Sequence, residues 1–394
     1  MSHRRFGALI AAVAIAATAC TSGGGATPAG SASAPPAGSP SGAASPSGSA
    51  ATGDCLVGVS WNNYQQERWA KADEPAIQAA LEAGGAQYAR TDARDDESQQ
   101  LTDVDSLINQ GAKVLIILAK DSVAIQPAVD KAKAAGIPVI AYDRLIFDSE
   151  TFYISFNNQG VGAAMAEVIT QEVTEGNYVI IKGHQADPNA DFLRAGMDPF
   201  LKPLTDSGAV EIVFEDYTDT WRTEAAQENM ETALNQVNND VQAVISENDS
   251  MAIGVIAALD RVGLAGQVPV TGQDGDKANL NHVAKGNQLV DVWKDAFALG
   301  ETAGNVAVQL CNGTAMADVT APDTLKDHVR PDDLGATDFS TEDPDGNEVT
   351  VKSIILKPTP VTQENLNLPI DLGWLTKEEA CADVDPATGP EACK

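Results

Sequence analysis

The feature that most limits the possible folds is the alternation of short apolar runs with segments of helical periodicity. Runs such as residues 114–119 (VLIILA) and 152–156 (FYISF) have the length and apolar content of buried strands, and helix-period segments follow them. Strand–helix alternation over about 300 residues indicates parallel sheets with helices on both faces. One such sheet would not use that much chain, so we expect an α/β protein with two lobes.

The apolar run at residues 137–142 is followed directly by two opposite charges, Asp143 and Arg144. A surface turn would explain the pair, but ligands of open α/β sheets bind outside the carboxyl ends of the strands. Further polar or aromatic side chains stand near the ends of other expected strands. They are Trp61, Arg68, Trp69, Asn189, Arg194, Trp221, Asn248, Asp274 and Lys294. We therefore expect these ends to converge on one crevice.

Taken singly, these residues have simpler interpretations. Asn248 alone favours a helix N-cap, and Trp221 alone favours a place in the core. Together they combine bidentate and charged hydrogen-bonding groups with flat apolar rings, which suits the hydroxyl edges and C–H faces of a sugar. The chain has no glycine-rich phosphate loop, and DPDGNE at residues 343–348 is better explained as a tight turn than as a calcium loop.

The first twenty residues have the parts of an export signal. Arg4 and Arg5 precede an apolar run, residues 8–17, that is too short to span a bilayer. The sequence ATAC ending at Cys20 resembles a bacterial lipoprotein cleavage box, which predicts a signal peptide over residues 1–19 and a lipidated Cys20. A plain signal peptide with an incidental cysteine is the alternative, and the arginine pair leaves Sec and twin-arginine export both open.

Residues 21–53 consist of Gly, Ser, Ala, Pro and Thr without a single charge. Such a composition cannot bury apolar surface, so residues 20–53 are predicted to be the lipidated cysteine and a flexible tether. The folded part is then exported and held at the outer face of the cytoplasmic membrane. Removing residues 1–19 changes the formal net charge from −31 to −33, which argues against nucleic acid as a partner.

Four of the five cysteines follow the tether: Cys55, Cys311, Cys381 and Cys393. An even number in an exported chain favours disulfides. Cys381 and Cys393 bracket a short, turn-rich loop and are expected to pair, which leaves Cys55 for Cys311; four cysteines allow three pairings, so this is a preference. No CxxC spacing or paired histidine accompanies them, and no metal site is expected.

Several segments, among them VGVSWNNYQQERW, GIPVIAYDRLI, FYISFNNQGVG and VISENDSMAIGVIAAL, resemble the periplasmic sugar-binding proteins of ABC importers. The resemblance runs in order from about residue 55 to 375. It is strongest to the D-xylose-binding members and next to the multiple-sugar-binding (glucose/galactose/arabinose) members. It implies the type I periplasmic-binding-protein fold, in which two Rossmann-like lobes are joined by three hinge crossings.

The resemblance also implies a sugar in the cleft between the lobes. Its contacts carry over to Arg68, Asp143, Arg144, Asn189, Arg194, Trp221, Asn248, Asp274 and Lys294, with Trp61 and Trp69 as possible additional stacking residues. The segments GHQADPNAD and YTDTW depart from the familiar pattern of the family, which leaves the identity of the sugar open. The expected lobes are residues 54–156 with 291–350 and residues 157–290 with 351–375, followed by a tail over 376–394.

We therefore expect a monomeric, extracytoplasmic binding lipoprotein that delivers D-xylose to an ABC permease by hinge closure. A binder of several monosaccharides, with or without a sensory receptor as a further partner, is the alternative. No cofactor is expected. A glycosidase would need a protonated carboxyl group, and Arg144 and Lys294 should keep Asp143 and Asp274 ionised, so no enzymatic activity is expected.

Overall fold

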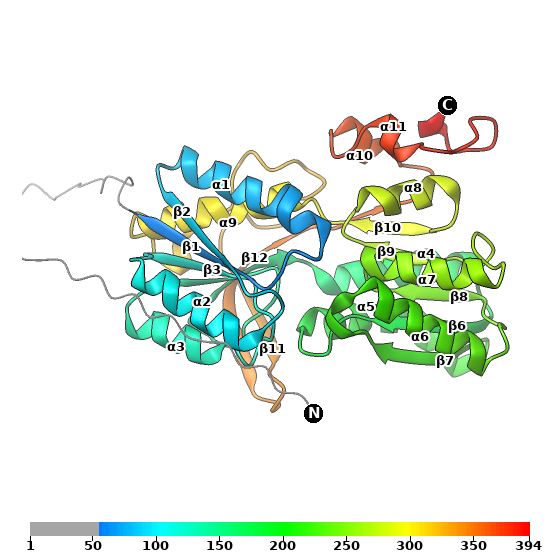
Figure 1. Cartoon of the computed structure of the whole chain (residues 1–394), viewed down its shortest axis with the longest axis horizontal. Helices are drawn as coiled ribbons and strands as arrows, with labels where there is room; N and C mark the ends of the chain where they lie inside the picture. The colour runs from blue at the N-terminus through cyan, green and yellow to red at the C-terminus, as the bar shows by residue number, and fades with distance from the viewer. Residues whose placement is uncertain (1–54) are drawn as a thin grey trace, which may run out of the picture. The chain divides into compact units, whose positions relative to one another are not determined.

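The computed structural model describes residues 55–394, which form two α/β lobes (Figure 1). The predicted signal peptide, the lipidation site at Cys20 and the tether lie outside the described residues. Within the described part, no helix has the length and apolar character needed to cross a membrane.

The first lobe is built on a seven-stranded sheet with the order β11-β12-β5-β4-β3-β1-β2. Its strands pair in parallel except β11, which is antiparallel to β12. The strands are β1 (Leu56–Trp61), β2 (Gln87–Asp92), β3 (Val114–Ile117), β4 (Val139–Tyr142), β5 (Phe152–Phe156), β11 (Thr337–Glu342) and β12 (Glu348–Leu356).

Helices cover both faces of this sheet because β1, β3 and β4 are apolar on both sides. One face packs against α1 (Glu74–Ala83) and α9 (Ala296–Cys311), through residues such as Leu81 and Leu299. The other face packs against α2 (Glu97–Asn109) and α3 (Gln126–Ala134). A short π-helix, η2 (Trp69–Asp73), leads into α1.

The second lobe carries the strands β7-β6-β8 and β9-β10-β13, which a parallel bridge between Val244 and Val270 joins. Its strands are β6 (Gly176–Lys182), β7 (Val210–Tyr217), β8 (Ala243–Ser246), β9 (Thr271–Gln273), β10 (Val290–Trp293) and β13 (Thr359–Val361). Its helices are α4 (Asn158–Glu172), α5 (Pro188–Ser207), α6 (Thr223–Gln236), α7 (Asp249–Arg261) and α8 (Lys277–Lys285).

The chain crosses between the lobes three times, after β5, after β10 and after β12, as the predicted fold class requires. The expected lobe boundaries differ from the strand pairing at two places. The boundary at 290/291 cuts β10, which pairs with β9 and β13. The boundary at 350/351 cuts β12, whose residues Lys352–Leu356 pair with β5, so this strand belongs to the first lobe.

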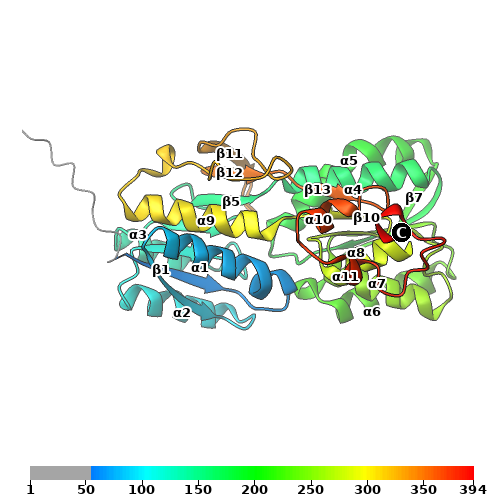
Figure 2. The same cartoon turned by 90° about the horizontal axis from the view of Figure 1, so that it is seen from above.

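Beyond β13, the tail forms α10 (Asn367–Asp371), α11 (Lys377–Ala380) and the 3-10 turn η5 (Glu391–Cys393). It lies beside α8 (Figure 2), and buried Leu375 and Ala380 share an apolar cluster with Leu280 of α8. Both expected disulfides are present, with Cα–Cα distances of 6.0 Å for Cys55–Cys311 and 5.4 Å for Cys381–Cys393. The first ties the start of β1 to the end of α9, and the second closes the tail.

Candidate functional site

The carboxyl ends of strands from both lobes meet around a narrow cavity of about 20 Å³. Asp143 and Arg144 follow β4 of the first lobe, while Asp274 and Lys294 follow β9 and β10 of the second. The lining residues are Gln66, Arg68, Trp69, Asp143, Arg144, Asp187, Asn189, Trp221, Asn248, Gln273, Asp274 and Lys294. The cavity therefore lies at the carboxyl ends of the strands of both lobes, where ligands of open α/β sheets bind.

Arg68 is the centre of the charged groups in this space. Its Nε and Nη2 donate to the two carboxylate oxygens of Asp73 at 3.0 and 2.9 Å. Its Nη1 lies 3.2 Å from Asp143 Oδ2 and 3.1 Å from Asp274 Oδ1. All of these side chains are buried, so the guanidinium group neutralises carboxylates that water does not screen.

A second ion pair crosses between the lobes at Arg144, whose Nε lies 2.8 Å from Asp187 Oδ2. Asp187 is the N-cap of α5, where its other carboxylate oxygen accepts from the Asn189 backbone N–H. The indole N–H of Trp221 donates to Asp187 Oδ2 at 3.2 Å, which fixes the ring beside the cavity. Burial raises the pKa of Asp187, against the lowering effect of Arg144.

Asp143 is held as a carboxylate at the end of β4. Burial alone would raise its pKa, but Lys294, Arg68 and Arg144 outweigh this effect and lower the pKa below its ordinary value. Its backbone carbonyl accepts from Ser155 Oγ at 2.7 Å and from Asn189 Nδ2 at 3.1 Å. The side chain is thus a fixed, ionised acceptor and a poor proton donor.

Three lining residues have left-handed backbone conformations that non-glycine residues rarely adopt: Asp143 (φ 61°), Trp221 (φ 59°) and Asp274 (φ 104°). Each such residue costs free energy that the surrounding fold has to offset. These conformations turn the side chains into the cavity, and their gathering at one place marks it as a functional site.

Polar atoms in the cavity wall remain without hydrogen-bond partners. They are Trp69 Nε1 and Gln273 Oε1, both of them buried. The rings of Trp69 and Trp221 add flat apolar surface, and the Arg68 guanidinium lies 4.4 Å from the centroid of the Trp69 ring. The cavity wall therefore offers both donors and acceptors to a small polar ligand.

The lobes also contact each other directly around the cavity. Gln66 Oε1 of the first lobe accepts from Asn248 Nδ2 at 3.1 Å and from Ser250 Oγ at 2.7 Å. Lys120 Nζ lies 3.0 Å from His184 Nε2 of the second lobe. Burial, with Lys120 and Arg144 nearby, lowers the pKa of His184 to about 4. This ring is therefore neutral at pH 7, so it can accept from the ammonium group across the two lobes.

Most residues named from the sequence lie together in this wall; that they contact a sugar stays a prediction. Those that line the cavity are Arg68, Asp143, Arg144, Asn189, Trp221, Asn248, Asp274, Lys294 and Trp69. Asn248 is also the N-cap of α7, accepting from Met251 N, so the simpler interpretation of this residue is confirmed, and its contact with a sugar stays a prediction.

Two of the expected residues do not line the cavity. Arg194 points to the outer side of α5, where it pairs with Asp198 one turn later and with Glu215 of β7. Trp61 is fully buried at the end of β1 and packs against Tyr64, Trp69 and Tyr142. Its alternation along β1 turns it into the core instead of the crevice.

Sequence reasoning does not find Gln66 and Asp187. Asp187 had a usable signal, because Asp followed by Pro indicates the start of a helix, here in the loop after β6. Gln66 lies in an irregular segment between β1 and η2, and no periodicity indicates which of its polar residues faces the second lobe.

Comparison with known proteins agrees with this geometry. Residues 57–315 match the family model of the periplasmic binding protein domain. The chain is 38% identical over 273 residues to the D-xylose-binding periplasmic protein of Escherichia coli (strain K12), which covers 69% of this chain and 82% of that protein. It is 31% identical over 291 residues to the multiple sugar-binding periplasmic protein SbpA of Azospirillum brasilense, covering 68% of this chain and 81% of that one.

Among solved structures, a solute-binding protein of an ABC transporter from Clostridium phytofermentans, with bound β-D-glucose, superposes with a TM-score of 0.70. The two chains are 27% identical, and the superposition covers 82% of this chain and 99% of the other. The resemblance expected from the sequence is confirmed, and so is the type I fold. Since the family model covers more than half of the 394 residues, this chain belongs to the periplasmic binding protein family.

Proposed function

We propose that this chain is the sugar-binding component of an ABC importer and that D-xylose is its ligand. The observation that carries the proposal is the cavity wall, in which buried carboxylates, amides and cations from both lobes stand beside the rings of Trp69 and Trp221. The hydroxyl groups of a sugar can form hydrogen bonds with these polar groups, and its C–H faces can pack on the tryptophan rings. The name of the relative from Escherichia coli supports xylose in particular.

The function is binding without chemistry. The relatives and the family are binding proteins, in agreement with the expectation that the chain is not an enzyme. The electrostatics support the same conclusion, because Lys294, Arg68 and Arg144 keep Asp143 ionised and so deprive the site of a general acid there.

Hinge closure provides the mechanism of delivery. Asp143 and Arg144 come from the first lobe, whereas Asp187, Asn189 and Asp274 come from the second. A sugar held by both sets stabilises the closed arrangement over an open one by its differential affinity, and a permease that recognises the closed form would then receive loaded protein.

Isothermal titration calorimetry of residues 53–394 with D-xylose, D-glucose and L-arabinose tests the proposal. We expect tight binding of D-xylose and weaker binding of D-glucose, because a hexose would have to place an additional hydroxymethyl group in a narrow cavity that is lined by the rings of Trp69 and Trp221. Equal affinities would favour the multiple-sugar alternative, which the similarity to SbpA also supports. Absence of heat with every monosaccharide would contradict sugar binding.

We further propose that lipidation of Cys20 anchors the protein at the outer face of the cytoplasmic membrane, as the cleavage box and the uncharged tether indicate. In Triton X-114 partitioning, the wild-type protein should enter the detergent phase and Cys20→Ser should stay in the aqueous phase. Identical partitioning of the two forms would exclude a lipid at Cys20.

A further inference from the structure

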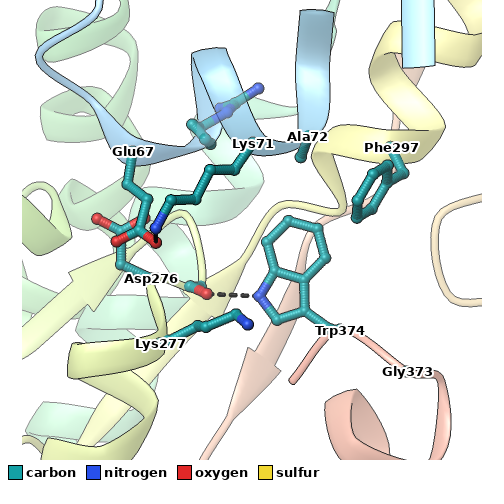
Figure 3. Close-up of a pocket in the computed structure, with 10 residues that line it drawn as sticks. Glu67, Lys71, Ala72, Asp276, Lys277, Phe297, Gly373 and Trp374 are labelled. Carbon is teal, nitrogen blue, oxygen red and sulfur yellow. Dashed lines mark hydrogen bonds and ion pairs between the residues drawn. The ribbon is translucent and has the colours of Figure 1, made fainter. Parts of the chain in front are cut away.

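A groove next to the second crossing is walled by both lobes and by the tail. Its volume is about 350 Å³. Figure 3 shows the indole of Trp374, from the tail, standing between Phe297 of α9 and the turn that carries Asp276. The lining residues are Glu67, Arg68, Lys71, Ala72, Gly275, Asp276, Lys277, Phe297, Gly373 and Trp374. Arg68 thus separates this groove from the proposed sugar cavity, whose wall it also forms.

Trp374 makes three contacts, each to a different segment. Its indole N–H donates to the backbone carbonyl of Gly275 at 2.6 Å. Its ring lies 5.4 Å from that of Trp293 in β10, centroid to centroid. The ring also meets the edge of Phe297 at 5.5 Å and an interplanar angle of 80°. Phe297 begins α9 of the first lobe, so this last contact joins the lobes.

The turn to which Trp374 donates its hydrogen bond also carries Asp274, one of the carboxylates that line the cavity. Asp274 and Gly275 both have positive φ, 104° and 83°. A Cβ at Gly275 would come within 2.3 Å of Trp293 Cδ1, so the turn is pressed against that ring. The turn is therefore held from one side by Trp293 and from another by the Trp374 N–H.

The tail fixes Trp374 to the second lobe. Glu379 of α11 pairs with Lys277 of α8 at 2.7 Å, and Asn281 Nδ2 donates to the Ala380 carbonyl at 3.0 Å. The disulfide between Cys381 and Cys393 closes the segment that follows. Trp374 is therefore attached to the second lobe, whereas Phe297 belongs to α9 of the first.

We propose that Trp374 is a positioning residue for the sugar site, a role that rests on the proposed function. Its N–H fixes the turn of Asp274, and its contact with Phe297 favours the closed arrangement of the lobes. A contact made only on closure stabilises the closed state alone, so its loss speeds ligand release and leaves ligand capture nearly unchanged.

The test compares Trp374→Phe, Trp374→Ala and Phe297→Ala by stopped-flow binding of D-xylose. Val262→Ala is the matched control, because Val262 is another exposed apolar residue but lies at the end of α7. We expect Phe297→Ala to raise the dissociation rate about 3–10-fold, the scale of one aromatic pair. Trp374→Phe, which keeps an aromatic ring but loses the N–H and part of the indole's ring surface, should also raise it, and Trp374→Ala should raise it most. The association rate and the control should not change.

Dissociation rates of all three variants equal to that of the wild type would overturn the proposal. A second outcome would also overturn the proposal: an unchanged dissociation rate in Trp374→Phe, with a faster dissociation in Trp374→Ala that its lower thermal stability accounts for. Trp374 would then have a packing role only. Small-angle scattering without sugar provides a second arm: Phe297→Ala should have a larger radius of gyration than wild type and Val262→Ala should not. If wild type binds no sugar, the proposed function fails, while the scattering still decides the role of Trp374 in closure.

Discussion

Nη1 of Arg68 lies 3.1 Å from Oδ1 of Asp274, and this buried ion pair joins the two lobes. The same nitrogen lies 3.2 Å from Asp143 Oδ2, so one donor serves a carboxylate from each lobe. The other side of the guanidinium group is occupied by Asp73. The cavity is thus built around charges that balance one another, and a change at one carboxylate alters the field that a ligand meets.

Asp143→Asn should weaken D-xylose binding by about 2–4 kcal/mol while changing the free energy of unfolding much less. The substitution keeps the shape of the side chain but removes a charge-assisted acceptor inside a buried wall. Calorimetry measures the affinity, and urea denaturation the stability. Asp260→Asn, at an exposed position of α7, removes the same charge far from the cavity and should bind like wild type. Wild-type affinity in Asp143→Asn would mean that Asp143 and Arg144 only form the turn after β4 and do not bind the sugar.

Gly183→Ala should damage the site through Trp221. A Cβ at position 183 would lie 2.1 Å from the Trp221 ring, so the indole must move away from Asp187, to which it donates. Overpacking of this kind costs about 1–3 kcal/mol of stability, and we expect a loss of xylose affinity in addition. Gly335→Ala is the control, since its added Cβ would come no closer than 3.4 Å to any neighbour. Unchanged affinity in Gly183→Ala would show that the position of the Trp221 ring is irrelevant to binding.

The sequence predicts the fold and most of the cavity wall because both depend on local patterns. Apolar runs define the strands, and the residue after a parallel strand is forced to the carboxyl edge of its sheet. Arg194 shows the limit of this reasoning. It lies on the same helix as Asn189, but the helix turns it outward to Glu215, and only the packing of α5 against the sheet decides which face is buried. The prediction for Trp61 is limited in the same way, because only the packing of β1 decides which of its faces is turned into the core.

The pairing of strands that are far apart in sequence is another feature of the fold that the apolar pattern does not predict. The sequence of β12 does not show which sheet the strand joins. That depends on its neighbour β5, which lies about 200 residues earlier in the chain. Gln66 is hidden in a similar way, because its partner Asn248 belongs to the other lobe.

Two of the buried carboxyl groups through which stability should depend on pH lie behind the Asp274 turn. Asp249 Oδ2 and Asp291 Oδ1 both accept from the Gly275 backbone N–H at 3.1 Å. Burial raises the pKa of Asp291 to about 7, and burial together with Asp291 raises that of Asp249 well above its ordinary value. The folded state therefore binds more protons than the unfolded state, and the free energy of unfolding should fall as pH rises from about 4 through about 7.

Asp291→Asn should flatten this dependence, because the amide does not titrate and nearly preserves the shape. The contribution of one proton is a slope of at most about 1.4 kcal/mol per pH unit. Urea denaturation at several pH values between 5 and 8 measures the slope for wild type and variant, with Asp260→Asn as the control at an exposed site. Equal slopes in all three proteins would mean that Asp291 is not the titrating group.

The two disulfides should separate stability from binding. Cys55–Cys311 joins positions 256 residues apart. It lies at the start of β1, whereas the cavity lies beyond the carboxyl ends of the strands. Cys55→Ser with Cys311→Ser should lower the free energy of unfolding by about 2–5 kcal/mol through the larger freedom of the unfolded chain. Its xylose affinity should stay near that of wild type.

Cys381→Ser with Cys393→Ser opens a loop of only 12 residues' separation. The loop-entropy argument then predicts a smaller loss of stability than for the first pair, by about 2–3 kcal/mol. Because this bridge closes the tail that holds Trp374, we expect faster xylose release instead. Urea denaturation and stopped-flow binding on both double variants measure the two effects. The reverse result, with binding altered by the first pair and unaltered by the second, would contradict the assignment of the tail to the sugar site.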